Sequence, residues 1–260
     1  VEEASNDITY LDNSFNNSEL DFYYKSPLRS DSKFEIGYDG RFVNYFEDLD
    51  FDVDILEGIY KFNYNRDIHA LYFEYEKKIN EKFSFKPSIR YEYVSNNIST
   101  ELSGPDLPAS YDGDQTFIHW IIDKYTDSDL YESYENDYAT TYPDLHFTYN
   151  INEDKSIQFG LSKRVERPGS GRHGGGGMQI KPFPRDIYSR DFLFIGNPFL
   201  KPEYSTQYDI SYRAPAPMGF FYTNFYYHEL ENVISWYDDD TVENQDVLTF
   251  RNSDRGYNYG

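Results

Sequence analysis

The stretch "FSFKPSIRYEY", Phe83–Tyr93, alternates apolar and polar residues with a period of two. Phe83, Phe85, Ile89, Tyr91 and Tyr93 fall in one row, and Ser84, Lys86, Ser88, Arg90 and Glu92 fall in the other. Successive side chains of a β-strand point to opposite faces of the sheet. The stretch therefore predicts a strand with one apolar face and one polar, largely ionic face.

The same alternation recurs through most of the chain. It is found in "KFEIGYDGRF" (33–42), "PDLHFTYNI" (143–151), "SIQFGLSKRV" (156–165) and "QYDISYR" (207–213). The stretch "RDIHALYFEYEKKI" (66–79) also fits an amphipathic helix, but only "NEK" separates it from the next strand, so we predict a strand there too. The 28 Tyr and 21 Phe favour pleated structure. We predict an all-β chain of about nine antiparallel strands, each long enough to cross a bilayer when tilted.

Short and long connections alternate along the sequence. Short turns are expected near 26–32, 80–82, 152–155 and 214–219, and long polar loops near 47–67, 94–140, 167–202 and 231–246. A transmembrane β-barrel has short turns on the inner side of the membrane and long loops on the outer side. Alternation of this kind would gather all the long loops at one end of the strands.

The two faces of such strands allow two interpretations. If the apolar face contacts lipid, the ionic face lines a lumen; if it contacts a protein core, the ionic face is in water. Lys77, Lys163 and Glu229 interrupt the apolar rows near strand ends, where a lipid-facing charge costs only about 0–1 kcal/mol. The high aromatic content, 20% of residues, favours the membrane, because aromatic girdles lie at both interfaces.

Composition excludes several classes of function. The formal net charge of −22 argues against nucleic acid as a partner, because phosphate binding needs a basic face. The chain has no cysteine, which excludes disulfide scaffolds and thiol nucleophiles. The sequence contains no run of 18 apolar residues, so it predicts no membrane-spanning helix. The opening "VEEASNDITY" has no signal-peptide pattern, so we expect a cleaved leader or an internal piece of a longer chain.

Four segments resemble a known family. "GNPFLKPEYSTQYDISY" (196–212) resembles the GNP-x-L-x-PE element of TonB-dependent receptors. The hairpins predicted over 66–93 and 140–168, the second ending in Arg-x-x-Arg-Pro, and "FRNSDRGYNYG" (250–260) are similar to the outer-membrane β-barrel family of these receptors, in the expected order. The resemblance covers roughly residues 18–260. The Gly-rich part of 167–184 departs from the family pattern and predicts a flexible loop.

The resemblance implies a fold and a domain organisation. Residues 1–260 would form part of one antiparallel transmembrane β-barrel domain, about nine strands of about 22. The plug domain of the family would be missing from this chain. The location would be the outer membrane of a Gram-negative cell, with outer-membrane lipid as a partner.

The resemblance also implies a function. The outer loops would bind a nutrient, which could be a small molecule, a glycan or a peptide. The TonB motor complex, acting through the missing plug, would drive import through the lumen. No enzymatic activity and no cofactor are expected. Two other functions stay open: a passive scaffold barrel that docks a surface lipoprotein or another protein, and a soluble β-rich extracellular binding module. An outer-membrane barrel enzyme is a fourth alternative.

Aromatic residues of the second long loop are the candidate ligand contacts. Tyr and Trp give large rigid contact surfaces with polar tips, which suit sugars and protein partners. The candidates are Phe117, Trp120, Tyr125, Tyr131 and Tyr134. The alternative is that these side chains pack the loop against itself.

The sequence predicts no metal site and no catalytic site. The five histidines lack the spacing of zinc ligands. The alternating aspartates of "EDLDFDVD" (47–54) could chelate calcium but lack the glycine and terminal glutamate of an EF-hand loop. Gly174–Gly177 is not followed by the lysine of a phosphate-binding loop. In the GNP element, Pro198 and Pro202 are expected to keep the loop out of the sheet, because proline has no backbone donor.

Overall fold

The computed structural model describes residues 8–53, 56–104, 116–124, 130–169, 179–185, 187, 192–238 and 247–260. Its elements are β1 (Ile8–Arg29), β2 (Ser32–Val53), β3 (Leu56–Lys78), β4 (Phe83–Ser103), α1 (Thr116–Lys124), β5 (Leu130–Asn150), β6 (Ser156–Glu166), β7 (Leu193–Phe194), β8 (Glu203–Ala216), β9 (Gly219–Asp238) and β10 (Val247–Tyr259). Among these residues, no helix has the length and hydrophobicity needed to cross a membrane.

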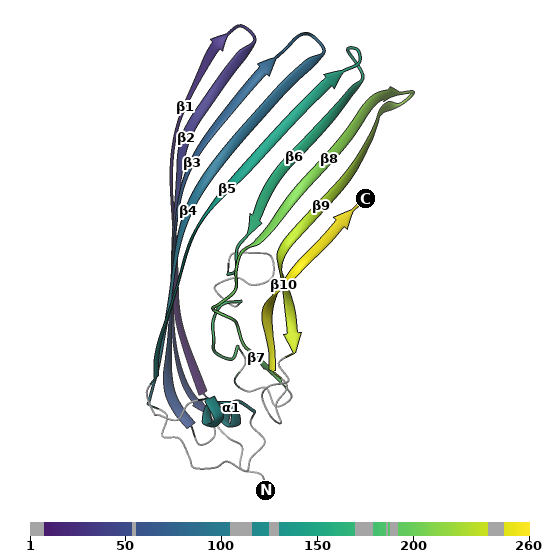
Figure 1. Cartoon of the computed structure of the whole chain (residues 1–260). Coiled ribbons are helices and arrows are strands. Elements are labelled where there is room, and N and C mark those ends of the chain that lie inside the picture. The colour runs from purple at the N-terminus through teal and green to yellow at the C-terminus, as the bar shows by residue number, and fades with distance from the viewer. Residues whose placement is uncertain are drawn as a thin grey trace.

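All the described strands belong to one sheet with the order β1-β2-β3-β4-β5-β6-β8-β9-β10-β7. The long strands pair antiparallel, and only the two-residue β7 pairs parallel, with β10. The sheet is curved, and the described parts of the segment between β6 and β8, residues 167–169, 179–185, 187 and 192–202, lie on its concave side (Figure 1). The prediction of about nine antiparallel strands is confirmed, including the ambiguous stretch 66–79, which belongs to β3 up to Lys78.

The four short turns are also where the sequence predicts them, and they lie together at one end of the sheet (Figure 1). Two of them use the same chemistry. The side-chain oxygen of Asn80 accepts hydrogen bonds from the backbone of Lys82 and Phe83. The side-chain oxygen of Asn152 does the same for Asp154 and Lys155. Asparagine favours tight turns because its side chain can close them in this way.

At the other end, the strands extend into three of the four stretches that the sequence predicts as long loops. β2 and β3 together cover all of 47–67 except residues 54 and 55. β4 continues to Ser103, and β9 continues to Asp238. Only 167–202 is mostly irregular where it is described. Polar composition led to the loop prediction, but these residues keep the alternation of a strand.

The reason is that strands such as β3 and β4 exchange their apolar and polar faces partway along their length. On β4 the outward row is apolar from Phe83 to Tyr93, with Ile89 49% exposed, and then continues as Ser95, Asn97, Ser99 and Glu101. The inward row changes the opposite way, from Arg90 and Glu92 to the buried Val94, Ile98 and Leu102.

The same change occurs on β3. Leu71, 61% exposed, and Phe73 face outward near the turn, and Asp67, Asn65 and Asn63 follow in the same outward row. An outward apolar band beside the short turns, with polar positions beyond it, has the pattern of strands that cross a bilayer and continue into water.

Beyond the apolar band, the inner face carries a hydrophobic core. Phe183 stacks on Tyr60 with 3.9 Å between ring centroids and contacts Phe117 and Trp120 edge-on. Phe51 joins this cluster from β2. Helix α1 lies beside the far ends of the first strands, where it contributes to this core (Figure 1).

Candidate ligand-binding site

Hydrogen bonds mark the level at which the outer face changes from apolar to polar. The hydroxyl of Tyr93 donates to Asp137 at 2.8 Å, and Ser95 donates to the other oxygen of the same carboxylate at 2.7 Å. Two strands away, Tyr38 and His69 are joined at 2.8 Å. Tyrosines with an apolar ring and a bonded hydroxyl suit the boundary between lipid and water. We call this level the outer boundary.

At nearly the same level, the inner face carries a chain of ion pairs, which we call the ionic network. Asp39 pairs with Arg41 at 3.2 Å and with Arg90 at 3.1 Å. Glu92 pairs with Arg90 at 2.6 Å and with Arg167, which follows β6. The network contains three arginines and two carboxylates, so it carries one excess positive charge. Burial lowers the pKa of Arg167, but Glu92 and the neighbouring tyrosines outweigh this effect and keep that pKa above its ordinary value.

Further from the turns, β3, β4 and β5 place three polar side chains side by side. In the strand register, Arg66 of β3 lies opposite Asn96 of β4, and Asn96 lies opposite Asn136 of β5. We call these three residues the polar rung. The neighbouring inward rungs are Tyr64–Ile98–Tyr134 on one side and Ile68–Val94–Tyr138 on the other. The polar rung is therefore enclosed between two apolar or aromatic rungs of the same sheet.

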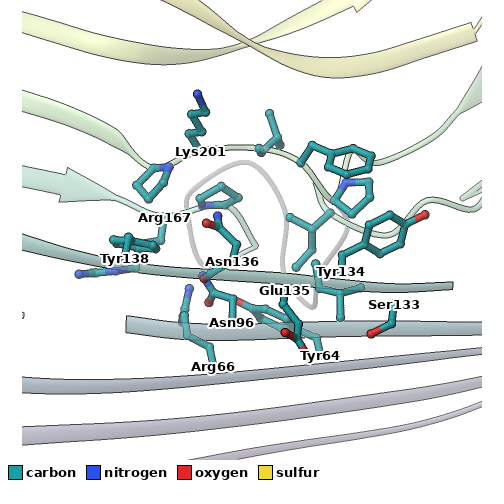
Figure 2. A pocket seen from close by; sticks show the side chains of 17 residues that line it. Tyr64, Arg66, Asn96, Ser133, Tyr134, Glu135, Asn136, Tyr138, Arg167 and Lys201 are labelled. Atoms are coloured by element: carbon teal, nitrogen blue, oxygen red, sulfur yellow. The ribbon is translucent and has the colours of Figure 1, made fainter. Parts of the chain in front are cut away.

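A cavity of about 380 Å³ lies over this rung (Figure 2). Its other wall is the segment 198–202 of the GNP element, together with Pro168 and Ile180. The ring of Phe199 meets Tyr134 edge-on, with 5.0 Å between centroids. The cavity thus separates the sheet from a proline-rich loop, and no strand pairing closes it on the loop side.

Hydrogen bonds from β10 hold this loop in place. The side chain of Asn252 accepts from the backbone nitrogen of Lys201 at 2.8 Å and donates to the carbonyl of Lys201 at 2.9 Å. Asn197 donates to the carbonyl of Phe250 and accepts from the backbone of Phe199, both at 2.9 Å. The GNP element keeps the chain out of the sheet until β8 begins at Glu203, as its prolines predict.

Arg66 is the unusual member of the site. The residue is only 7% exposed, and its Nε and Nη1 have no hydrogen-bond partner among the described residues. Its guanidinium carbon lies 5.7 Å from the centroid of the Tyr64 ring. Its side chain rises from β3 toward the cavity (Figure 2). The Oδ1 atom of Asn96 is also buried without a partner in the described part of the chain. The cavity wall therefore offers a cationic donor beside a neutral acceptor.

Three of the five aromatic residues proposed from the sequence have described side chains, and these lie in the hydrophobic core or against it. Phe117 and Trp120 are buried in the hydrophobic core and pack on Phe183. Tyr134 lines the cavity. Tyr131 belongs to β5, but its side chain, like all of Tyr125, lies outside the described residues. Ligand contact by these residues stays a prediction.

Sequence reasoning missed Arg66 and Asn96. A signal was present: the even-numbered residues from Tyr60 to Ala70 form an apolar or aromatic row that Arg66 alone interrupts. Because 47–67 was predicted to be a loop, this row was not recognised as one face of a strand. Within the described ranges, no three His, Asp or Glu side chains are grouped so as to hold a metal ion. Residues 170–178 of the Gly-rich stretch lie outside the described residues.

Comparisons with known proteins agree with this architecture. A family model described as "Outer membrane protein beta-barrel family" matches residues 2–260. The comparison with curated proteins gave no match.

Two solved structures illustrate the similarity of fold. The ferric yersiniabactin uptake receptor FyuA from Yersinia pestis has a TM-score of 0.59 at 8% identity, over 88% of this chain and 31% of that one. A double mutant of the Serratia marcescens hemophore receptor HasR, in complex with its hemophore HasA and heme, also has a TM-score of 0.59, at 17% identity, over 96% of this chain and 39% of that one. The chain thus spans less than half the length of either receptor.

Proposed function

The chain belongs to the outer membrane protein beta-barrel family, and from this premise we propose that it is part of a receptor barrel that binds a nutrient at the cell surface and imports it. It is a Gram-negative outer-membrane protein with an antiparallel β-barrel fold. The observation that carries the proposal is the position of the cavity over the polar rung. It lies beyond the outer boundary, next to the ionic network of the inner face.

A molecule bound in this cavity would be at the entrance of a polar pathway. Below the cavity, the inner face carries ionic and polar side chains on successive strands, including Glu35, Glu74 and Lys86. Such a surface suits the passage of a hydrated solute, whereas the apolar outer face suits lipid. The strands themselves need do no chemistry on the solute. In this proposal, the TonB motor supplies the energy through a plug domain outside residues 1–260.

The soluble binding module receives no support from the exposed rows. Leu71, Phe73 and Ile89 lie on the outer face, where a soluble protein would leave them in water. A row of this kind on several neighbouring strands is the sign of a lipid-facing surface. A scaffold barrel would have the same lipid-facing surface, so only a measurement of nutrient uptake distinguishes it from a transporter.

Uptake by a strain that lacks the gene tests the proposal. The full-length gene is deleted, and uptake of a panel of labelled sugars, peptides and metal chelates is compared with the parent strain and with a strain that lacks TonB. We expect both deletions to abolish uptake of the same nutrient, and the restored gene to recover it. Unchanged uptake of every nutrient, together with co-purification of a surface lipoprotein, would support the scaffold instead.

A further inference from the structure

We propose that the cavity over the polar rung binds an anionic small molecule, whose carboxylate pairs with Arg66 and whose neighbouring N–H or O–H donates to Asn96. The inference rests on the proposed function, because it names the class of nutrient that the same site would take. The inference is based on the side chains of Arg66 and Asn96 and on the cavity between strands β3–β5 and the loop 198–202.

The first argument is the charge of Arg66. An arginine buried without a carboxylate partner loses hydration that the neighbouring Tyr64 replaces only in part, which is unfavourable. Other buried or half-buried cations of this inner face have carboxylate partners: Arg90 and Arg167 pair with Glu92, and Lys181 pairs with Glu47. Arg66 differs, because its Nε and Nη1 have no partner among the described residues. A bound carboxylate would give it the partner that its neighbours already have.

The second argument is the local sign of charge. The whole chain carries a formal charge of −22, yet the cavity is lined by Arg66, Arg167 and Lys201. Its one acidic lining residue, among those described, is Glu135, whose side chain is exposed in the outward row of β5. The four other members of the ionic network, Arg41, Arg90, Asp39 and Glu92, carry no net charge together. An acidic protein that surrounds one cavity with positive charge favours an anion there.

The third argument is the acceptor beside the cation. Arg66 and Asn96 are direct cross-strand partners, so their Cβ atoms lie about 4.5–5.5 Å apart. Asn96 uses its Nδ2 to donate to the carbonyl of Asn136 at 3.3 Å, which leaves its Oδ1 free to accept within the described structure. A ligand that carries a donor on the atom next to its carboxylate would satisfy both residues. Inorganic phosphate can also pair with the cation and donate from its P–OH, but it has no apolar part to contact the aromatic lining.

The remaining lining sets the size and polarity of the ligand. Tyr64, Tyr134, Tyr138 and Phe199 flank the polar rung. They would contact an apolar or aromatic part of the ligand next to its charged end. A volume of about 380 Å³ lies in the range of small-molecule sites. The site therefore fits an N-acylated amino acid, a short peptide terminus or a 2-hydroxy acid with an apolar substituent.

Binding to the purified full-length protein tests the inference. The probes are N-acetyl-phenylalanine, its uncharged amide N-acetyl-phenylalaninamide, and inorganic phosphate, measured by calorimetry in detergent. We expect the acid to bind and the amide to bind at least about 30-fold more weakly, because the amide leaves a buried charge unpaired. Equal affinity for acid and amide, or binding of phosphate alone, would overturn the proposal.

Variants assign the binding to the two residues. We expect Arg66→Met to weaken binding of the acid at least about 30-fold and to raise the unfolding temperature of the unliganded protein, because an unpaired buried charge is removed. Asn96→Ala should reduce the affinity by a smaller factor. Arg164→Met is the matched control, since Arg164 lies on the same inner face, paired with Asp144, and does not line the cavity. Normal binding by Arg66→Met would contradict the proposal.

Uptake separates this inference from the proposed function. If the deletion strain loses uptake of a nutrient and the Arg66→Met gene restores it fully, import stands and the role of Arg66 is wrong. If the acid binds through Arg66 but uptake of every nutrient is independent of the gene, the binding site stands and import is wrong.

Discussion

Tyr93 of β4 donates a hydrogen bond of 2.8 Å to Asp137 of β5, at the point where the outer face of both strands changes from apolar to polar. Ser95 bonds the same carboxylate, so one aspartate fixes the first polar positions beyond the apolar row. The bond joins the last aromatic residue of β4 to the first acidic residue in the outward row of β5, counted from the short turn. It places the outer boundary on this part of the sheet, and the predictions below depend on that position.

The first prediction concerns the apolar band. Phe73→Arg should impair assembly of the barrel, because a charge that faces lipid near the bilayer midplane costs about 2–4 kcal/mol. Asn65→Arg, eight residues away in the same outward row but beyond the boundary, should have little effect. Heat-modifiable gel mobility and unfolding in detergent-free lipid vesicles would measure both. Equal effects of the two substitutions would contradict the position of the boundary.

The second prediction concerns the ionic network. Glu92→Leu removes a buried carboxylate that pairs with both Arg90 and Arg167, and it should destabilise the protein by about 3–5 kcal/mol. Glu229→Leu is the control, since Glu229 lies 3.8 Å from Arg255 at a more exposed position, where a pair contributes about 0–1 kcal/mol. Denaturant unfolding in lipid vesicles would compare them. If Arg167→Met restores the stability of Glu92→Leu, the loss comes from the ion pair between Arg167 and Glu92.

The third prediction concerns the hydrophobic core at the outer ends of the strands. Phe183 is fully buried and contacts Tyr60, Phe117 and Trp120, so Phe183→Ala should cost about 3–5 kcal/mol. Phe199→Ala should cost far less, because Phe199 is largely exposed. Unfolding measurements would test the difference. A small effect of Phe183→Ala would mean that this core adds little to stability.

The fourth prediction concerns the loop 198–202. Asn252→Ala removes both hydrogen bonds that tie Lys201 to β10, and it should increase hydrogen exchange of the loop amides. It should also weaken binding of N-acetyl-phenylalanine, because the loop forms one wall of the cavity. Asn17→Ala, at an exposed position of β1, is the control. Unchanged exchange in Asn252→Ala would show that other contacts hold the loop.

Much of the fold could be predicted because its determinants are local. The alternation in 83–93 sets a strand and its two faces, and Asn80 and Asn152 set tight turns with their own side chains. The order of these features along the chain predicts antiparallel neighbours. None of this requires knowledge of which residues meet across the sheet.

The strand lengths and the binding cavity were decided by the tertiary structure. Beyond the outer boundary, the polar residues Asn65 and Ser95 face outward, and their neighbours Tyr64 and Val94 are buried on the inner face. A stretch whose polar composition predicts a loop is therefore a strand whose apolar and polar faces are exchanged. The polar rung depends on register, which brings Arg66 beside Asn96 although 29 residues separate them.

The sequence by itself thus determined where the strands near the short turns lie, their turns and their apolar rows, because a period of two and a turn asparagine act over a few neighbouring residues. Only the tertiary structure decided that Phe117 and Trp120 belong to the core and that Arg66 faces a cavity. Burial and pairing of a charge depend on groups from distant parts of the chain, and only folding brings those groups together.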